Sequence, residues 1–125
     1  EDIKNNRLYV LYSNEELISA FVLCDTNLGE KSVEWQDNQR KSLYLDRLGV
    51  NVNYSRMGIG SLMLDKAKEV AQNCGAEYLR LFVVDINVPA IHLYIKNGFI
   101  RANGIYDEVI DKDLVLHEYG FEAAL

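Results

Sequence analysis

The feature that most constrains this chain is a glycine-bearing turn, Gly58-Ile59-Gly60, between a strand-like segment and an amphipathic helix. Residues 41–53 before the turn are rich in β-formers, and apolar residues recur at helical spacing over 60–73. A helix N-terminus carries unpaired N–H groups and a positive dipole end, and glycines let a phosphate approach the backbone. The turn therefore predicts a strand–turn–helix unit. Whether it binds a phosphate or nothing stays open on this motif alone.

Two common phosphate-binding classes fit the turn poorly. A P-loop needs lysine after its last glycine, whereas Ser61 follows Gly60 directly. A dinucleotide-binding fingerprint needs a small residue where Met63 stands. A nucleotide-binding domain of another class is therefore the least favoured of three hypotheses for this chain.

Before the turn, the pattern predicts a β-hairpin from strands 7–12 and 17–24 around a polar turn. Residues 25–40 predict a long loop with a short strand near Trp35, which we expect to anchor a loop that shapes a binding site. In the strand 41–53, strict alternation would place Leu43, Leu45 and Arg47 on one face and Tyr44, Asp46 and Leu48 on the other.

After the turn, Gly75 is placed to end the helix, and the apolar run 78–84 predicts a buried central strand. Asn87 is a good N-cap for a short helix over 88–97, which would end at Gly98. Extended segments at 98–101 and 114–121 follow. The order β-β-β-α-β-α-β-β predicts one domain over residues 1–125, of α/β (α+β) class, with a mixed sheet and at least two helices.

The composition of the chain argues against several classes of protein. The formal net charge of −6 argues against nucleic acid as a partner, because phosphate binding needs a basic face, and it suits a cationic acceptor only weakly. No apolar run approaches the roughly 18 residues of a membrane helix, and no signal peptide is visible. Cys24 and Cys74 match no zinc pattern and predict free thiols in a reducing cytoplasm.

A second motif lies downstream, where Asn87, Ala90, Tyr94, Gly98 and Phe99 read Asn-x-x-Ala-x-x-x-Tyr-x-x-x-Gly-Phe. With the glycine turn and the strand end Leu48-Gly49-Val50, this segment closely resembles the GNAT superfamily of acetyl-CoA-dependent N-acetyltransferases. The resemblance runs from residue 8 to the C-terminus. It implies a mixed, mostly antiparallel central sheet with flanking helices.

The resemblance also implies a reaction and a site without metal. The acceptor amine would attack the thioester of acetyl-CoA directly in a ternary complex, and Tyr94 would protonate the departing thiolate. The backbone of Leu48, Gly49 and Val50 would pair with the pantetheine and supply an oxyanion donor. Further cofactor contacts are implied for Arg56, Met57, Gly58, Ile59, Gly60, Ser61, Asn87 and Ala90.

The chain departs from the family pattern in two places. Ser55 stands at the Gln/Arg position of the phosphate loop, and Arg56 comes one residue later. The family has a first strand and helices before the hairpin, whereas almost nothing precedes Arg7. We therefore expect a fragment, or an acceptor side that is open or completed by another subunit.

The sequence constrains the identity of the general base less than it constrains the cofactor contacts. Relatives place a carboxylate or histidine at the positions of Tyr44 or Asp46, so Asp46 is the first candidate and Glu34 the second. An exposed aspartate is a weak base for an ammonium, so Asp46 would need burial or a water relay. His92 is expected on a helix surface and His117 in the last strand.

The acceptor stays open among small amines, polyamines, aminoglycosides, peptide N-termini and protein lysines. Many relatives are dimers, so a homodimer also stays open. A catalytically silent acyl-CoA-binding module is the alternative to an enzyme.

Overall fold

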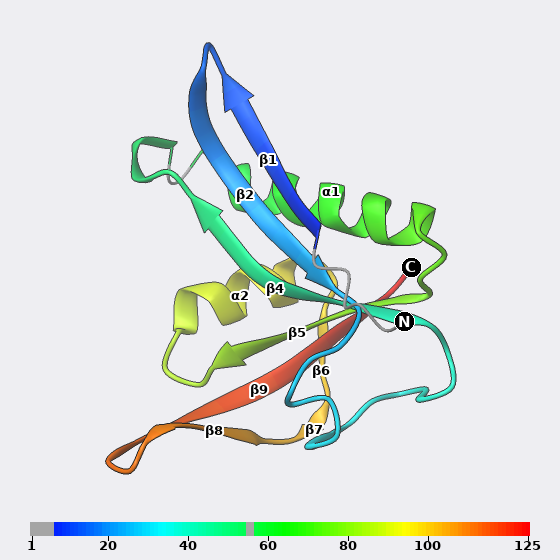
Figure 1. Ribbon diagram of the computed structural model, residues 1–125. Coiled ribbons are helices and arrows are strands. Elements are labelled where there is room, and N and C mark those ends of the chain that lie inside the picture. The colour runs from blue at the N-terminus through cyan, green and yellow to red at the C-terminus, as the bar shows by residue number, and fades with distance from the viewer. Residues whose placement is uncertain (1–6, 55–56) are drawn as a thin grey trace.

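The computed structural model describes residues 7–54 and 57–125. Within them, one mixed sheet has the strand order β1-β2-β4-β5-β9-β6, with β8 paired to β9 (Figure 1). Its strands are β1 (Arg7–Ser13), β2 (Glu16–Cys24), β4 (Ser42–Val50), β5 (Tyr78–Val84), β6 (Ile100–Arg101), β8 (Tyr106–Asp111) and β9 (Leu114–Ala124). The short strands β3 (Val33–Glu34) and β7 (Asn103–Gly104) pair separately. Only β4 and β5 run parallel.

The predicted helices are confirmed as α1 (Ile59–Asn73) and α2 (Val88–Lys96). Gly75 ends α1 as expected, with φ of 88°. The Gly75 N–H donates to the Gln72 carbonyl at 2.9 Å, and the Ala76 N–H donates to the Ala71 carbonyl at 3.0 Å. These bonds form a Schellman motif, which satisfies the last carbonyls of the helix.

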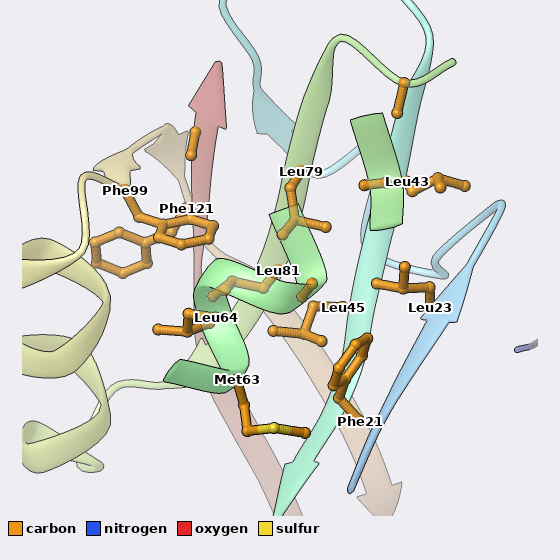
Figure 2. Close-up of a cluster of buried hydrophobic side chains, with 14 of the residues drawn as sticks. Phe21, Leu23, Leu43, Leu45, Met63, Leu64, Leu79, Leu81, Phe99 and Phe121 are labelled. Atoms are coloured by element: carbon orange, nitrogen blue, oxygen red, sulfur yellow. The ribbon is translucent and has the colours of Figure 1, made fainter. Parts of the chain in front are cut away.

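The main hydrophobic core lies between α1 and one face of the sheet. Met63 and Leu64 of α1 lie in one buried cluster with Leu81 of β5 and Phe21 of β2, as Figure 2 shows. Phe121 extends the same core across β9. The side chains of Leu64, Leu81 and Phe121 are at most 1% exposed. This burial fixes α1, and therefore its N-terminus, against the middle of the sheet.

A second buried cluster covers the opposite face. It contains Tyr44, which alternates with Leu43 and Leu45 of the main core, and Trp35 from the loop after β2. The Trp35 indole N–H donates to the Glu30 carbonyl at 2.8 Å. Trp35 therefore anchors the loop to the sheet, as the sequence predicts.

A charged pair is buried beside this second cluster. The Nε atom of Arg80 lies 3.1 Å from Oε1 of Glu122, and each side chain is 3% exposed. Glu122 also accepts a hydrogen bond from the Gln36 N–H at 2.8 Å, and Arg80 donates to the Asp37 carbonyl at 2.8 Å. The pair therefore joins two sheet strands to the loop.

The prediction for the strand 41–53 is wrong in two respects, namely where the strand ends and which of its residues share a face. The strand β4 stops at Val50, and residues 52–54 form a 3₁₀ turn. Val22 of β2 pairs with Arg47, whereas the next residue, Leu23, pairs with Leu45, so Asp46 is the extra residue of a β-bulge. Leu48, rather than Arg47, consequently packs on the core face.

The sheet opens between its two central strands. Parallel pairing joins β4 to β5 only from Ser42 with Tyr78 to Leu45 with Leu81. Beyond these residues the strands diverge toward their C-terminal ends (Figure 1). The segments 46–50 and 82–84 therefore line a wedge-shaped split, and the bulge at Asp46 lies where the split begins.

The sequence analysis assigned no element to the strand β8. This strand pairs antiparallel with β9, and the predicted last strand 114–121 extends to Ala124. The strand β8 adds three acidic residues, Asp107, Glu108 and Asp111, to the edge of the sheet beside β9. Among the described residues, no helix is long and apolar enough to span a membrane.

Candidate active site

The glycine turn at the start of α1 begins with a residue in the left-handed backbone region. Gly58 has φ of 75°, in the left-handed region, and a Cβ built there would meet no atom within 4 Å. No side chain of the described residues caps this helix end. A Cβ on Gly60 would lie 3.0 Å from Cδ2 of Leu93, so this glycine permits α1 to pack closely against α2. The first N–H groups of α1 have no acceptor within the helix, as at any helix N-terminus.

The neighbours of this turn have different surroundings. Met57 is 68% exposed. Ile59 is half-buried against the main core, and the Ser61 hydroxyl accepts a hydrogen bond from the Asn97 side chain at 3.0 Å. Arg56, for which the sequence analysis implied a cofactor contact, and Ser55, which departs from the family pattern, lie outside the described residues.

The second motif forms α2, as predicted. The Asn87 side chain caps the helix by accepting a hydrogen bond from the Ala90 N–H at 3.3 Å. Tyr94 packs edge-on against Phe99, with ring centroids 5.9 Å apart. Burial raises the pKa of Tyr94 above the ordinary value of 10. The phenol therefore keeps its proton at neutral pH.

The cap at Asn87 gives a direct prediction. Replacing Asn87 by alanine leaves the Ala90 N–H without its acceptor, so the free energy of unfolding should fall by about 1 kcal/mol. Urea unfolding measures this change. Asn87→Asp keeps an accepting oxygen and serves as the matched control. An alanine variant as stable as the aspartate variant would contradict the capping role.

The end of β4 borders a shallow apolar hollow. Gly49 would have no neighbour within 4 Å of an added Cβ, and its carbonyl accepts a hydrogen bond from the Ser19 hydroxyl at 2.6 Å. Gly49 and Val50 line a hollow of about 390 Å³, while Leu48 is half-buried against the core. The described residues that line this hollow come from β2 and from the end of β4 with Asn51, so the hollow lies on the β2 side of β4.

A larger cavity of about 680 Å³ lies near the second cluster, between the loop 25–31 and strands β4, β5, β8 and β9. Phe82 and Tyr106 form part of its wall, with ring centroids 5.6 Å apart. A Cβ on Gly29 would lie 2.6 Å from Cδ2 of Tyr106, so only glycine allows the loop to approach this closely. The cavity is therefore walled by both sheet and loop.

The cavity is acidic. Its lining includes Glu30, Asp46, Glu108 and Glu118, against one cation, Lys31, among the described residues. Asp46 has a side chain 43% exposed, with Oδ2 3.8 Å from Nε of Arg47. Burial, followed by the hydrogen bond and charge of Glu108, raises the pKa of Glu118 to about 8. The lining of the cavity can therefore attract a cation, and it includes a carboxyl group, that of Glu118, which can exchange a proton near neutral pH.

The other candidate bases lie elsewhere. Glu34 is exposed in β3 and His92 is exposed on α2. His117 is exposed in β9, where its hydrogen bond to Asp107 at 2.6 Å raises its pKa. Tyr44 is 3% exposed in the second cluster, and burial raises its pKa. None of these four residues lines the 680 Å³ cavity as far as the described residues define it.

The structure brings Asp46 together with two carboxyl groups that the sequence analysis missed. Glu118 lies within the predicted last strand, and Glu108 lies in the unassigned segment before it. The available signal was the concentration of acidic residues, Asp107, Glu108 and Asp111, in one short segment. The described residues contain no group of three His, Cys, Asp or Glu side chains arranged to hold a metal ion.

Comparison with known proteins agrees with this architecture. The model of the acetyltransferase (GNAT) family matches residues 1–99. A thialysine N-epsilon-acetyltransferase from Bos taurus is 41% identical over 54 residues, covering 43% of this chain and 32% of the relative. Streptothricin acetyltransferase A from Bacillus subtilis is 32% identical over 94 residues, covering 73% of this chain and 53% of the relative.

A solved structure of a Bacillus subtilis acetyltransferase in complex with CoA superposes with a TM-score of 0.72 and 18% identity. It covers 96% of this chain and 77% of that structure, which confirms the expected mixed sheet with two helices. The chain belongs to the GNAT acetyltransferase family. It spans about a third of the cattle relative and about half of the streptothricin relative.

Proposed function

We propose that this chain transfers an acetyl group from acetyl-CoA to a primary amine, by direct attack of the amine in a ternary complex. The split between β4 and β5 carries the proposal. The glycine turn of α1 and Tyr94 of α2 belong to one side of the sheet, and the acidic cavity lies at the other. A thioester in the split could thus meet an amine that enters from the cavity.

Several residues fit acetyl-CoA as the co-substrate. The first N–H groups of α1, from Ile59 to Ser61, have no side-chain cap among the described residues and would bind the pyrophosphate. Met57 and Arg56 flank this position in the sequence. The backbone of residues 48–50 has no β5 partner and can pair with the pantetheine amides. Asn87 and Ala90 would border the cofactor from α2.

The remaining chemistry follows from these positions. A backbone N–H near Leu48, Gly49 or Val50 would stabilise the developing oxyanion. Tyr94 would donate its proton to the CoA thiolate, whose conjugate acid has a pKa near 8.5, as expected for a thiol. The acidic lining of the cavity would attract an ammonium and orient it toward the split.

The co-substrate is tested by thermal unfolding. A ligand that binds only the folded state stabilises it by about 2.7 kcal/mol at a hundred times its Kd. Acetyl-CoA at that excess should therefore raise the Tm by several degrees, whereas ATP and NAD should not. A shift with ATP or NAD and none with acetyl-CoA would contradict the proposal and favour a nucleotide-binding domain.

Turnover is tested by the release of free CoA with a panel of amines. The names of the two relatives justify placing thialysine and streptothricin first, followed by polyamines, aminoglycosides and peptides with free N-termini. We expect cationic acceptors to be preferred over neutral ones because the cavity is acidic. Tight acetyl-CoA binding without turnover of any amine would instead indicate a silent acyl-CoA-binding module.

A further inference from the structure

The acidic cavity contains an unusually placed carboxyl group. Glu118 pairs across the sheet with Val84 of β5 and Tyr106 of β8, and is only 9% exposed. Glu108 follows Tyr106 by two residues, so both lie on the same face of β8, next to Glu118. Glu118 is buried and Glu108 is half-buried, and a carboxyl group next to a second carboxyl group ionises less readily. Burial and the neighbouring Glu108 therefore favour the protonated form of Glu118.

This carboxyl group differs from the other buried glutamate of the same strand. Glu122 is neutralised by Arg80 at 3.1 Å. Glu118 forms no salt bridge with any described residue. The charged groups around the cavity are Glu108 from β8, Asp46 from β4, and Glu30 and Lys31 from the loop. A nine-tenths buried carboxylate without a cationic partner lines a cavity that can receive a cation.

We infer that Glu118, rather than Asp46, is the general base that removes the proton from the acceptor ammonium. This inference rests on the proposed function. The ammonium N–H bond breaks, and the proton passes to a carboxylate oxygen of Glu118. The amine lone pair then forms the N–C bond to the acetyl carbon, and the C–S bond breaks. The thiolate takes a proton from Tyr94, the second proton lost by the acylated nitrogen restores the Tyr94 phenol, and the proton on Glu118 returns to solvent.

The environment of Glu118 suits this role better than that of Asp46. A general base is most effective when its pKa lies near the working pH. The pKa of Glu118 is raised to about 8, first by burial and then by Glu108. The side chain of Asp46 is 43% exposed, so water screens its charge. Asp46 is better placed to attract the acceptor than to accept its proton.

The inference is tested by the pH dependence of kcat at saturating acetyl-CoA. For the wild-type chain, kcat should rise with pH and level off above about 8, since Glu118 must be deprotonated. Glu118→Gln should lower kcat about a hundredfold and remove this inflection, leaving a rate that follows the pKa of the amine itself. Glu108→Gln removes the neighbouring charge, so the inflection should move to lower pH.

Glu69→Gln, at an exposed position of α1, is the matched control and should leave the profile unchanged. If Glu118→Gln fails to fold, Glu118→Asp replaces it, and a lower kcat with the inflection retained is expected. A folded Glu118→Gln variant that binds acetyl-CoA and keeps both kcat and the inflection would overturn the inference.

A carboxyl ¹³C NMR titration separates this inference from the proposed function. The wild-type chain should contain one glutamate carboxyl group that titrates near pH 8, and Glu118→Gln should remove its signal. If every carboxyl group titrates below about pH 6, Glu118 is an ordinary acid and the inference fails, whatever the turnover. If the titration is as expected but no amine is acetylated, the proposed function fails, and the base role fails with it.

Discussion

Replacing Glu122 by alanine is expected to lower the free energy of unfolding by about 3–5 kcal/mol. The substitution leaves the guanidinium of Arg80 buried at 3% exposure without its carboxylate. It also removes the acceptor of the Gln36 N–H, which bonds to Glu122 at 2.8 Å. Urea unfolding monitored by the fluorescence of Trp35 measures the loss, because this ring packs 4.7 Å from the guanidinium carbon of Arg80.

The matched control removes both charges. Replacing Arg80 by methionine together with Glu122 by leucine leaves no unpaired buried charge, so the double variant should be more stable than Glu122→Ala. The Asp37 carbonyl then loses a donor, which costs part of the gain. A Glu122→Ala variant within about 1 kcal/mol of the wild-type chain would show that the pair contributes little to stability.

Replacing Tyr94 by phenylalanine is expected to lower kcat by a factor of about 10² to 10⁴, the usual contribution of a general acid. The ring contacts with Phe99 and Phe121 are kept, so the fold and the affinity for acetyl-CoA should change little. Steady-state kinetics at saturating acetyl-CoA gives kcat, and calorimetry gives the Kd of the co-substrate. The two measurements together separate the loss of a proton donor from the loss of packing.

Phe99→Leu is a useful comparison for Tyr94→Phe. It disturbs the packing partner of Tyr94 without removing the hydroxyl group, so stability should fall more than kcat. If Tyr94→Phe keeps kcat within about threefold, the phenol is not the acid. The thiolate would then have to take its proton from water or another group.

Much of the fold follows from local signals. The hairpin of β1 and β2, the helix α1 with its stop at Gly75, the buried strand β5 and the cap at Asn87 were all predicted. Each depends on residues within one turn or one strand, where apolar periodicity, glycine and a capping side chain act directly. The proposed cofactor side of the site consists of these same elements. The roles given to its residues remain predictions.

The proposed acceptor side of the site, which is the acidic cavity, could not be predicted from local signals. The bulge at Asp46 depends on how β4 pairs with β2, and strict alternation therefore placed Leu48 on the wrong face. The strand β8 is largely exposed, so it lacks the apolar signal of a buried strand. The neighbourhood of Glu108 and Glu118 arises only when β8 pairs with β9. Asp46 was predicted as a site residue, but these partners were not.

The split between β4 and β5 also bears on self-association. Unpaired strand edges tend to recruit strands from other molecules, and proteins commonly blunt or cover them. Here two extra edges, at 46–50 and 82–84, lie inside the sheet and diverge from their last pair, Leu45 with Leu81. The unpaired backbone groups of the split lie between paired strands, whereas among the described strands β1 pairs with β2 alone and so leaves one edge open at the border of the sheet. Strand addition by another molecule is therefore expected at β1 rather than in the split.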